Sequence, residues 1–236
     1  MRTTKALAAA ALAITALLTV SACGSSGTAS TSTAPASNGV ADKSADEILK
    51  AAQDAAKAET SVHMVGTVKQ DSGEMKIDMQ VEKGGKAVGT IVMAGATLEI
   101  ITTGTKVYVK GDKAFWDSQA GEGAYDLIGD KWVASTSDAD LASFKDFTDF
   151  TTAVSQMLTP SGTVTKTEAS TVDGQAVIGL KDGDKGTLWI ATTGDPLPVK
   201  IDGGAEGGVA FTDWGAAVKV TEPAAADVLD PSQLGQ

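Results

Sequence analysis

Hydrophobic and polar residues alternate along much of this chain. The alternation is clearest between residues 74 and 82, where Met75, Ile77, Met79 and Val81 share one side and charged or amide residues share the other. A period of two is typical of a strand with one buried and one wet face. Shorter versions predict strands over 62–68, 87–93, 97–101 and 106–110, with turns at 71–73 and 84–85. Because short turns join antiparallel neighbours, we expect an antiparallel meander.

Two helices are predicted beside these strands. Ser44 and Glu47 have the spacing of a capping box, so the first helix is expected to start at Ser44 and to run to about Glu59. The second is expected to open at Ser137 and to end at the turn 160–162. Its apolar residues form more than a narrow stripe: Leu141, Phe144, Phe147, Phe150, Val154, Met157 and Leu158. A helix that is apolar over so much of its surface is usually buried.

The chain returns to strands after the second helix. The pattern predicts strands over 163–168, 175–180, 187–191, 199–201, 209–213 and 217–220, with Asp182-Gly183-Asp184 as a hairpin turn. Residues 113–136 hold Phe115, Trp116 and Trp132 without a clear period and are expected to form an irregular connection. These elements together predict an α+β fold in which helices cover the apolar face of an antiparallel meander.

The N-terminus has the three parts of a secretory signal. Arg2 and Lys5 provide the positive charge, residues 6–20 are almost entirely apolar, and Val20-Ser21-Ala22 precedes Cys23, the only cysteine of the chain. The tetrapeptide 20–23 resembles a bacterial lipobox, which implies that Cys23 is lipidated and becomes the first residue of the mature protein. An ordinary signal peptide with a chance cysteine, or a short membrane anchor, are the alternatives.

Three segments follow from this interpretation. Residues 1–22 are the expected signal peptide, residues 23–43 are the lipidated cysteine and a Ser/Thr/Ala-rich tether, and residues 44–236 are a single domain. The tether contains almost no large apolar residue, so it cannot bury enough surface to fold. We therefore expect a domain outside the cytoplasm, held at the outer face of the cell membrane by the acyl chains on Cys23.

Charge and cysteine content limit the partners of this domain. Loss of the signal peptide leaves 17 basic residues against 30 acidic ones, a net charge of −13. Nucleic acid is excluded as a partner because its phosphates would repel such a domain. With its cysteine lipidated, the domain has no disulfide and depends on an ordinary apolar core.

The sequence offers no recognisable catalytic or metal-binding set. His63 is the only histidine, and the alternation puts it on the face opposite Val62 and Met64, where we expect it in solvent. Zinc sites need Cys and His clusters, and phosphate-binding loops need glycine patterns that this chain lacks. We expect no enzymatic activity and no cofactor, although a hydrolase that uses a pair of acidic residues remains an alternative.

Methionines mark the expected apolar face of the first strands. Met64, Met75 and Met79 fall on it, and methionine suits surfaces that accept varied apolar shapes. Such a face, closed by the second helix, would form a cavity for an apolar ligand. The competing interpretation is an ordinary core in which methionines fill gaps.

The order of these features resembles the LppX/LprG type of actinobacterial lipoprotein, whose fold is similar to that of the lipoprotein carrier LolA. The resemblance is carried by the lipobox and by residues 186–191 and 194–200, which look like the family's paired strands around a Gly-x-Pro turn. It covers about residues 44–229. It implies a curved antiparallel half-barrel covered by helices, whose concave side binds the acyl chains of lipids or glycolipids and carries them across the envelope.

Two hypotheses follow. In the first, the protein carries an amphiphilic lipid or glycolipid, and the ligand contacts are Met64, Met75, Ile77, Met79, Val81, Phe144, Phe147 and Phe150. In the second, the domain has a packed core and docks on an unidentified envelope protein or cell-wall polymer through its acidic surface and through Trp116, Trp132 and Trp214. The volume of any cavity inside the sheet separates the two.

Overall fold

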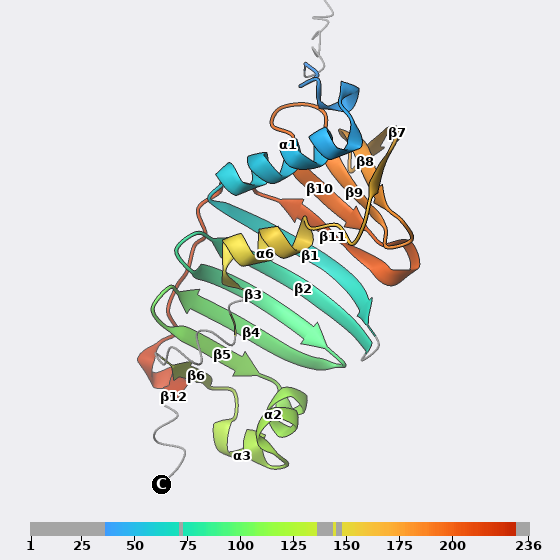
Figure 1. The fold of residues 1–236 in the computed structure, drawn as a ribbon. Coiled ribbons are helices and arrows are strands. Elements are labelled where there is room, and N and C mark those ends of the chain that lie inside the picture. Colours follow the sequence, from blue (N-terminus) through green and yellow to red (C-terminus); the bar gives the residue numbers. More distant parts are fainter. Residues whose placement is uncertain (1–35, 71–72, 136–143, 145–147, 230–236) are drawn as a thin grey trace, which may run out of the picture. The chain divides into compact units, whose positions relative to one another are not determined.

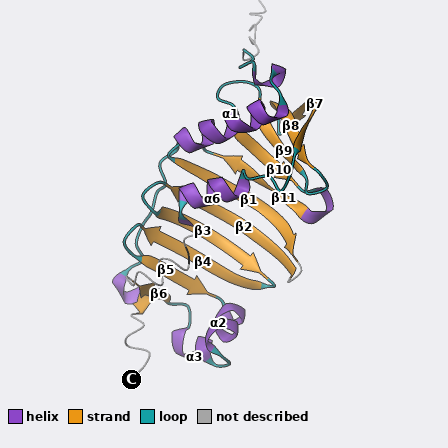
Figure 2. Cartoon of the chain, in the orientation of Figure 1, coloured by secondary structure: helices purple, strands orange, loops and turns teal. Residues whose placement is uncertain are grey.

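The structure is a computed structural model that describes residues 36–70, 73–135, 144 and 148–229. These residues belong to one compact unit, Pro35–Gln236. They form one open, curved 12-stranded sheet in the order β12-β6-β5-β4-β3-β2-β1-β11-β10-β9-β8-β7 (Figures 1 and 2). Neighbouring strands are antiparallel except for β12, which pairs with β6 in parallel. The predicted α+β fold, with helices on a curved antiparallel sheet, is confirmed.

The first half of the sheet is a continuous meander. Its strands are β1 (Ser61–Gln70), β2 (Gly73–Glu82), β3 (Lys86–Met93), β4 (Ala96–Thr103), β5 (Val107–Gly111) and β6 (Trp132–Ser135). The alternation between residues 74 and 82 becomes β2, in which Ile77, Met79 and Val81 are buried and the residues between them are exposed. The strands predicted over this half are confirmed.

The second half is another meander, and it joins the first at the centre of the 12-stranded sheet, where β1 pairs with β11. It consists of β7 (Val164–Val172), β8 (Gln175–Asp182), β9 (Thr187–Ala191), β10 (Pro198–Asp202) and β11 (Gly207–Thr212). Strand β11 pairs along β1, with Met64 opposite Phe211. The first and last long strands of the chain therefore lie side by side. The turn at Asp182-Gly183-Asp184 joins β8 to β9 as predicted.

Two helices lie on the same face of the sheet, as Figure 1 shows. Helix α1 (Ala45–Ala58) has the predicted capping box, in which the side chain of Ser44 accepts from the Glu47 amide and the Glu47 carboxylate accepts from the Ser44 amide. Helix α6 (Phe150–Met157) starts at its N-cap Asp149. The predicted start of the second helix, at Ser137, lies outside the described residues. Short 3₁₀ turns cover Val40–Asp42, Gly204–Glu206 and Ala225–Asp227.

Two sequence predictions about connecting segments are wrong. The stretch expected to be irregular contains α2 (Lys113–Ala120) and α3 (Ala124–Ile128), and α2 begins where the carboxylate of Asp112 accepts a hydrogen bond from the Phe115 amide. Residues 217–220 were expected to be a strand but form none, because the amide of Val218 donates to a side chain, that of Glu82, and not to a neighbouring strand. The pairing of β12 (Val228–Leu229) with β6 was not predicted.

The buried apolar residues form two separate clusters. We call the first the α6 cluster. It joins α6 and the end of α1 to β1–β5 and β11, and its members are Ala56, Val62, Met64, Ile77, Met79, Val81, Ala87, Ile91, Ile100, Val107, Val109, Phe150, Ala153, Val154, Leu158, Val209 and Phe211. The second, the α1 cluster, joins α1 to β7–β9 and consists of Val40, Ile48, Ala52, Val164, Ile178, Leu180 and Ile190. The apolar interior therefore consists of one cluster centred on α6 and one centred on α1, and α1 also contributes Ala56 to the first.

Candidate functional site

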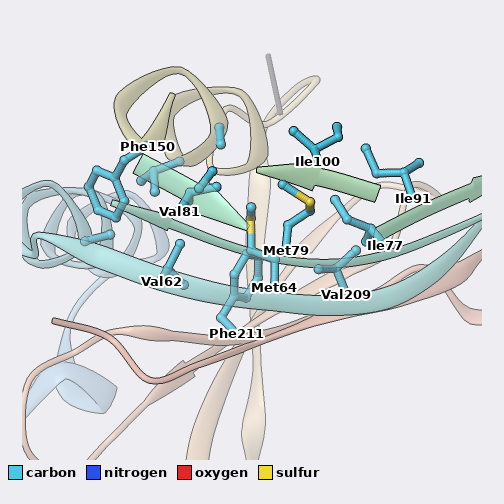
Figure 3. Packing of buried hydrophobic residues seen from close by; sticks show 14 of the residues in the cluster. Val62, Met64, Ile77, Met79, Val81, Ile91, Ile100, Phe150, Val209 and Phe211 are labelled. Atoms are coloured by element: carbon cyan, nitrogen blue, oxygen red, sulfur yellow. The ribbon is translucent and has the colours of Figure 1, made fainter. Parts of the chain in front are cut away.

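Most of the residues predicted to contact a ligand lie together in the α6 cluster. Met64, Ile77, Met79, Val81 and Phe150 are all buried beneath or on α6 (Figure 3). Met75 and Phe144 are partly buried and pack against the same cluster, whereas Phe147 and the lipidation site Cys23 lie outside the described residues. The structure thus brings the predicted contacts together as packed core, and their role in ligand binding stays a prediction.

An apolar pocket lies elsewhere, at the seam between the two clusters. Its volume is about 150 Å³. Its lining residues come from α1, the end of α6 and β7–β10: Leu49, Met157, Leu158, Thr159, Pro160, Val164, Leu180, Asp182, Lys185, Gly186, Thr187, Leu188 and Ile201. Leu188 packs against both clusters, while Leu158 belongs to one and Leu180 to the other. The pocket is therefore a space between the two clusters that their described residues leave open.

Two hydrogen bonds hold the roof of this seam pocket. The Gln53 side chain of α1 donates through Nε2 to the carbonyl of Leu158, at 2.9 Å, just beyond the end of α6. The amide of Ser161 donates to the Asp182 carboxylate at the end of β8, at 2.6 Å. The segment after α6 is thus bonded at one end to α1 and at the other to the β8–β9 hairpin. It passes over the pocket without closing it.

The β8–β9 hairpin shapes the mouth of the seam pocket. Gly186 has φ of +128°, and a β-carbon there would lie 2.5 Å from the carbonyl oxygen of Asp202, so the tight approach of the hairpin to β10 requires glycine. The amide of Lys185 donates to the carbonyl of Asp182 at 2.9 Å. These bonds fix the backbone that carries Asp182 and Lys185, the charged residues among the pocket's described lining.

His63 lies on the opposite face from Met64, as predicted, but it is only partly in solvent. Its side chain is 21% exposed, its Nε2 lies 2.7 Å from the Asp78 carboxylate and its Nδ1 lies 3.4 Å from that of Asp213. A small hollow of about 90 Å³ adjoins it. No group of three or more His, Cys, Asp or Glu side chains among the described residues is placed to hold a metal ion.

The tryptophans proposed as docking residues are not fully exposed. Trp116, Trp132 and Trp214 are all partly buried. Trp214 stacks on Phe211 with ring centroids 6.0 Å apart, and its indole Nε1 donates to the carbonyl of Pro198 at 3.0 Å. Its indole therefore contributes to the packing next to β11, and it offers little surface to a partner.

The seam pocket was missed because the sequence assigns residues to faces but does not divide a face into clusters. Leu180 and Leu188 are predicted on the apolar side of their strands, yet nothing in the alternation shows that Leu180 packs under α1 and that Leu188 bridges to α6. Leu49 was a weak indication of the pocket in the sequence, since it is an apolar residue next to the buried stripe of α1 and does not belong to that stripe. Within the described residues, no helix is long and apolar enough to cross a membrane.

Comparison with known proteins identifies the fold. No protein-family model and no curated protein matches the chain. Among solved structures, LprF from Mycobacterium bovis is similar with a TM-score of 0.51 and 19% sequence identity, over 76% of this chain and 97% of LprF. An uncharacterised conserved protein from Thermus thermophilus has a TM-score of 0.35 and 11% identity, over 79% and 98% of the two chains. A LolA superfamily protein from Nitrosomonas europaea has a TM-score of 0.23 and 9% identity, over 77% and 96%.

Of these three structures, LprF alone exceeds a TM-score of 0.5. Because the alignment spans nearly all of LprF, the similarity covers the whole domain and not one of its meanders. This chain therefore has the LprF fold, as its resemblance to LppX/LprG-type, LolA-like lipoproteins implied.

Proposed function

We propose that this protein is a membrane-anchored lipoprotein outside the cytoplasm that binds an amphiphilic lipid or glycolipid in an apolar cavity and carries it across the cell envelope. The observation that carries the proposal is the unfilled apolar seam between the α1 and α6 clusters. Apolar clefts with a few polar groups at the mouth are the usual form of a small-molecule site. The similarity to LprF supports the fold of this chain, whose described residues form this pocket. This role needs no catalytic residue and no cofactor.

The volume of the seam pocket indicates how much of a lipid it holds. At about 150 Å³ it equals an apolar cavity that accepts benzene, so it holds roughly six carbon atoms of an acyl chain. A longer chain needs further space, and the neighbouring α6 cluster is the apolar region into which it would extend. In the proposal, α6 separates from the sheet as the chain enters, and the residues predicted from the sequence contact its far end.

The methionines of the α6 cluster suit this entry. Met64 of β1 and Met79 of β2 are both buried and lie directly opposite each other across the two strands. Methionine side chains have flexible, unbranched stems that repack around different apolar shapes at low cost. A core built in this way would accept a chain without selecting its length closely, and selection would fall to the headgroup at the mouth.

The anchor in the proposal is Cys23. A diacylglyceryl group on its sulfur would hold the protein at the membrane, and the residues between Cys23 and the buried Val40 would connect the anchor to the domain. Stable membrane attachment by lipid takes more than one acyl chain, which a lipidated N-terminal cysteine provides.

The experiment that tests the binding function uses the chain from residue 24 on, which contains the complete sheet and both clusters. We expect native mass spectrometry and organic extraction to recover bound lipid, and the delipidated protein to take up a fluorescent acyl probe. Leu49→Trp places an indole in the seam pocket and should abolish uptake. Lys50→Trp adds the same group on the exposed side of α1 and should not.

Two outcomes would reject lipid binding in the seam pocket. One is the absence of both extracted lipid and probe uptake in a folded protein. The other is equal uptake by Leu49→Trp and Lys50→Trp, which would show that the probe binds away from the seam pocket. Circular dichroism of both variants establishes that each is folded before uptake is compared.

A second candidate function is docking on an envelope protein, favoured by one observation. Leu127 of α3 is 76% exposed, an unusual position for leucine in a helix that packs beside α2. If docking is the function, Leu127→Asp should prevent a single stoichiometric partner from being captured on cross-linking in intact cells. Lipid binding by the seam pocket predicts that this variant takes up the acyl probe normally.

A further inference from the structure

We infer that the seam pocket selects single-chain amphiphiles with a negatively charged headgroup, a carboxylate or a phosphate, and that the ammonium group of Lys185 pairs with it. This inference rests on the proposed lipid-binding function and adds the chemical class of the ligand. The evidence is a difference between the two charged residues among the described lining, Asp182 and Lys185. The carboxylate of Asp182 accepts a hydrogen bond from the backbone, whereas the ammonium group of Lys185 has no ion pair in the part of the chain that the structure describes.

The carboxylate of Asp182 is already engaged. Its Oδ2 accepts the hydrogen bond from the Ser161 amide at 2.6 Å, in the segment that forms the roof of the pocket. This hydrogen bond holds the backbone of the roof in place, so displacing the Ser161 amide from the carboxylate would free that segment. Asp182 therefore helps to hold the pocket's wall, and a cationic headgroup that took this oxygen would displace the Ser161 amide.

Lys185 is situated differently. Lys185 is exposed and is one of the residues that line the pocket, and within the described residues its ammonium group makes no ion pair with a carboxylate. Its backbone is fixed, since its amide donates to the Asp182 carbonyl and the Gly186 carbonyl accepts from the Asp182 amide at 3.0 Å. A cation held at the rim of an apolar pocket, on a rigid turn, complements an amphiphile whose chain is inside and whose anionic head is outside.

The neighbouring charges set the size of the effect. Asp182 lines the pocket and keeps its negative charge, and Asp184 lies in the same turn, is exposed and does not line the pocket. Both carboxylates therefore weaken the field of Lys185. An ion pair at a solvent-exposed rim contributes at most modestly, and we expect about a five-fold preference for an anionic over a neutral headgroup. This preference should decline as salt is added, because the pair is open to solvent.

The test measures dissociation constants of four ligands with the same acyl length: dodecanoate, dodecyl phosphate, 1-dodecanoylglycerol and dodecyltrimethylammonium. Each is used below its critical micelle concentration, in competition with the fluorescent acyl probe, on the delipidated chain from residue 24 on. The variants are Lys185→Gln and Lys185→Glu. The matched control is Lys181→Gln, which makes the same charge change on the same hairpin but on the face opposite Leu180, outside the pocket.

The inference is supported if the unaltered chain binds an anion about five-fold more tightly than the glycerol ester. This preference should be lost in Lys185→Gln and should reverse in favour of the cation in Lys185→Glu. It should be unchanged in Lys181→Gln. The two anions show whether carboxylate or phosphate is preferred. Equal binding of all headgroups, or a preference that survives Lys185→Gln, overturns the inference and leaves lipid binding intact. If no amphiphile binds, the proposed function fails as well.

Discussion

The carboxylate of Glu82, at the end of β2, accepts a hydrogen bond from the backbone amide of Val218, 136 residues further along the chain, at 2.8 Å. Val218 belongs to a segment, residues 213–227, that we call the C-terminal strap. The strap leaves β11, crosses the ends of β1 and β2, and reaches Lys131, whose ammonium group donates to the carbonyl of Ala226 at 2.7 Å (Figure 1). The strap, whose one regular element is the 3₁₀ turn Ala225–Asp227, is therefore held by side chains of β2 and of the residue before β6.

The bond between Glu82 and Val218 predicts a pH-dependent contribution to stability. The Val218 amide, and after it the Lys86 ammonium, hold the pKa of Glu82 below its ordinary value of 4.5. A carboxyl whose pKa is lower in the folded chain stabilises it above the ordinary pKa, and this contribution is lost as the pH falls through the lowered value. Glu82→Gln should therefore reduce the free energy of unfolding by about 1 kcal/mol at about pH 7.

Denaturant unfolding of the two proteins at about pH 7 and at about pH 3 measures this contribution. The difference between them should shrink as the pH falls through the lowered pKa of Glu82, because protonation removes the charge that accepts the Val218 amide. A difference that is the same at both values would mean that the carboxylate charge does not hold the strap.

Tyr108 and Glu222 form the next attachment of the strap. The buried Tyr108 hydroxyl donates to the Glu222 carboxylate, which also pairs with Lys106 at 3.4 Å. Burial, and after it the bond to Glu222, raises the pKa of Tyr108. Tyr108→Phe removes this donor and should free the strap locally. We expect faster cleavage by a protease within residues 213–227, with only a small fall in the unfolding midpoint, since local opening costs less than global unfolding.

Lys106→Gln is the control for Tyr108→Phe. It removes the exposed partner of Glu222 and keeps the hydroxyl, so cleavage of the strap should stay close to that of the unaltered protein. Equal cleavage of the strap in Tyr108→Phe and the unaltered protein would show that other contacts secure it.

Gly89 in β3 accommodates the side chain of Met79, its partner in β2. A β-carbon at Gly89 would lie 2.6 Å from the Met79 sulfur and 2.1 Å from the carbonyl oxygen of Asp78. Because the carbonyl belongs to the backbone, it cannot move aside alone. Gly89→Ala should therefore lower the free energy of unfolding by about 1–3 kcal/mol, measured by denaturant titration.

Gly162→Ala provides the comparison for Gly89→Ala. Its β-carbon would meet nothing nearer than 3.9 Å, so this substitution should leave stability almost unchanged or raise it slightly. If Gly89→Ala is equally harmless, the two strands separate more easily than the contacts indicate.

The sequence predicted the parts of this fold that follow from local rules. Met75 to Val81 alternate, so β2 was found, and Ser44 with Glu47 marked the start of α1. Helices α2 and α3 were missed because Gly121, Gly123 and Gly129 interrupt any longer period. The Asp112 cap was the available signal for α2. Residues 217–220 of the strap were predicted as a strand because Val218 and Val220 alternate with Lys219, but the Val218 amide bonds to Glu82, which is distant in sequence.

The candidate site was less predictable for a different reason. Met64, Met79 and Phe150 were placed together from alternation and helix character, and the structure packs them together. The position of the open volume depends on how two helices divide one sheet between them. That division is set by tertiary contacts such as Gln53 to Leu158, which leave no pattern in the sequence.

The lipidation of Cys23 predicts a simple change of location. Cys23→Ala removes the thiol that would carry the acyl chains, so the protein should leave the membrane fraction and lose the mass of the acyl groups. Fractionation of cells and mass spectrometry of the purified protein measure the two effects. A Cys23→Ala protein that still resists a carbonate wash of the membranes would indicate that residues 1–22 remain as an anchor.

The bond from Gln53 to the Leu158 carbonyl provides a test of how a lipid chain enters. In the proposed function α6 separates from the sheet, and this bond at 2.9 Å joins the end of α6 to α1. A hydrogen bond of this kind contributes about 1 kcal/mol, so its removal in Gln53→Met should speed uptake of a fluorescent acyl probe by up to about five-fold in stopped-flow measurements. Asp54→Asn, on the exposed side of α1, weakens only the pair with Lys50 and should not change the rate. Slower or unchanged uptake by Gln53→Met would mean that the chain enters without moving the end of α6 away from α1.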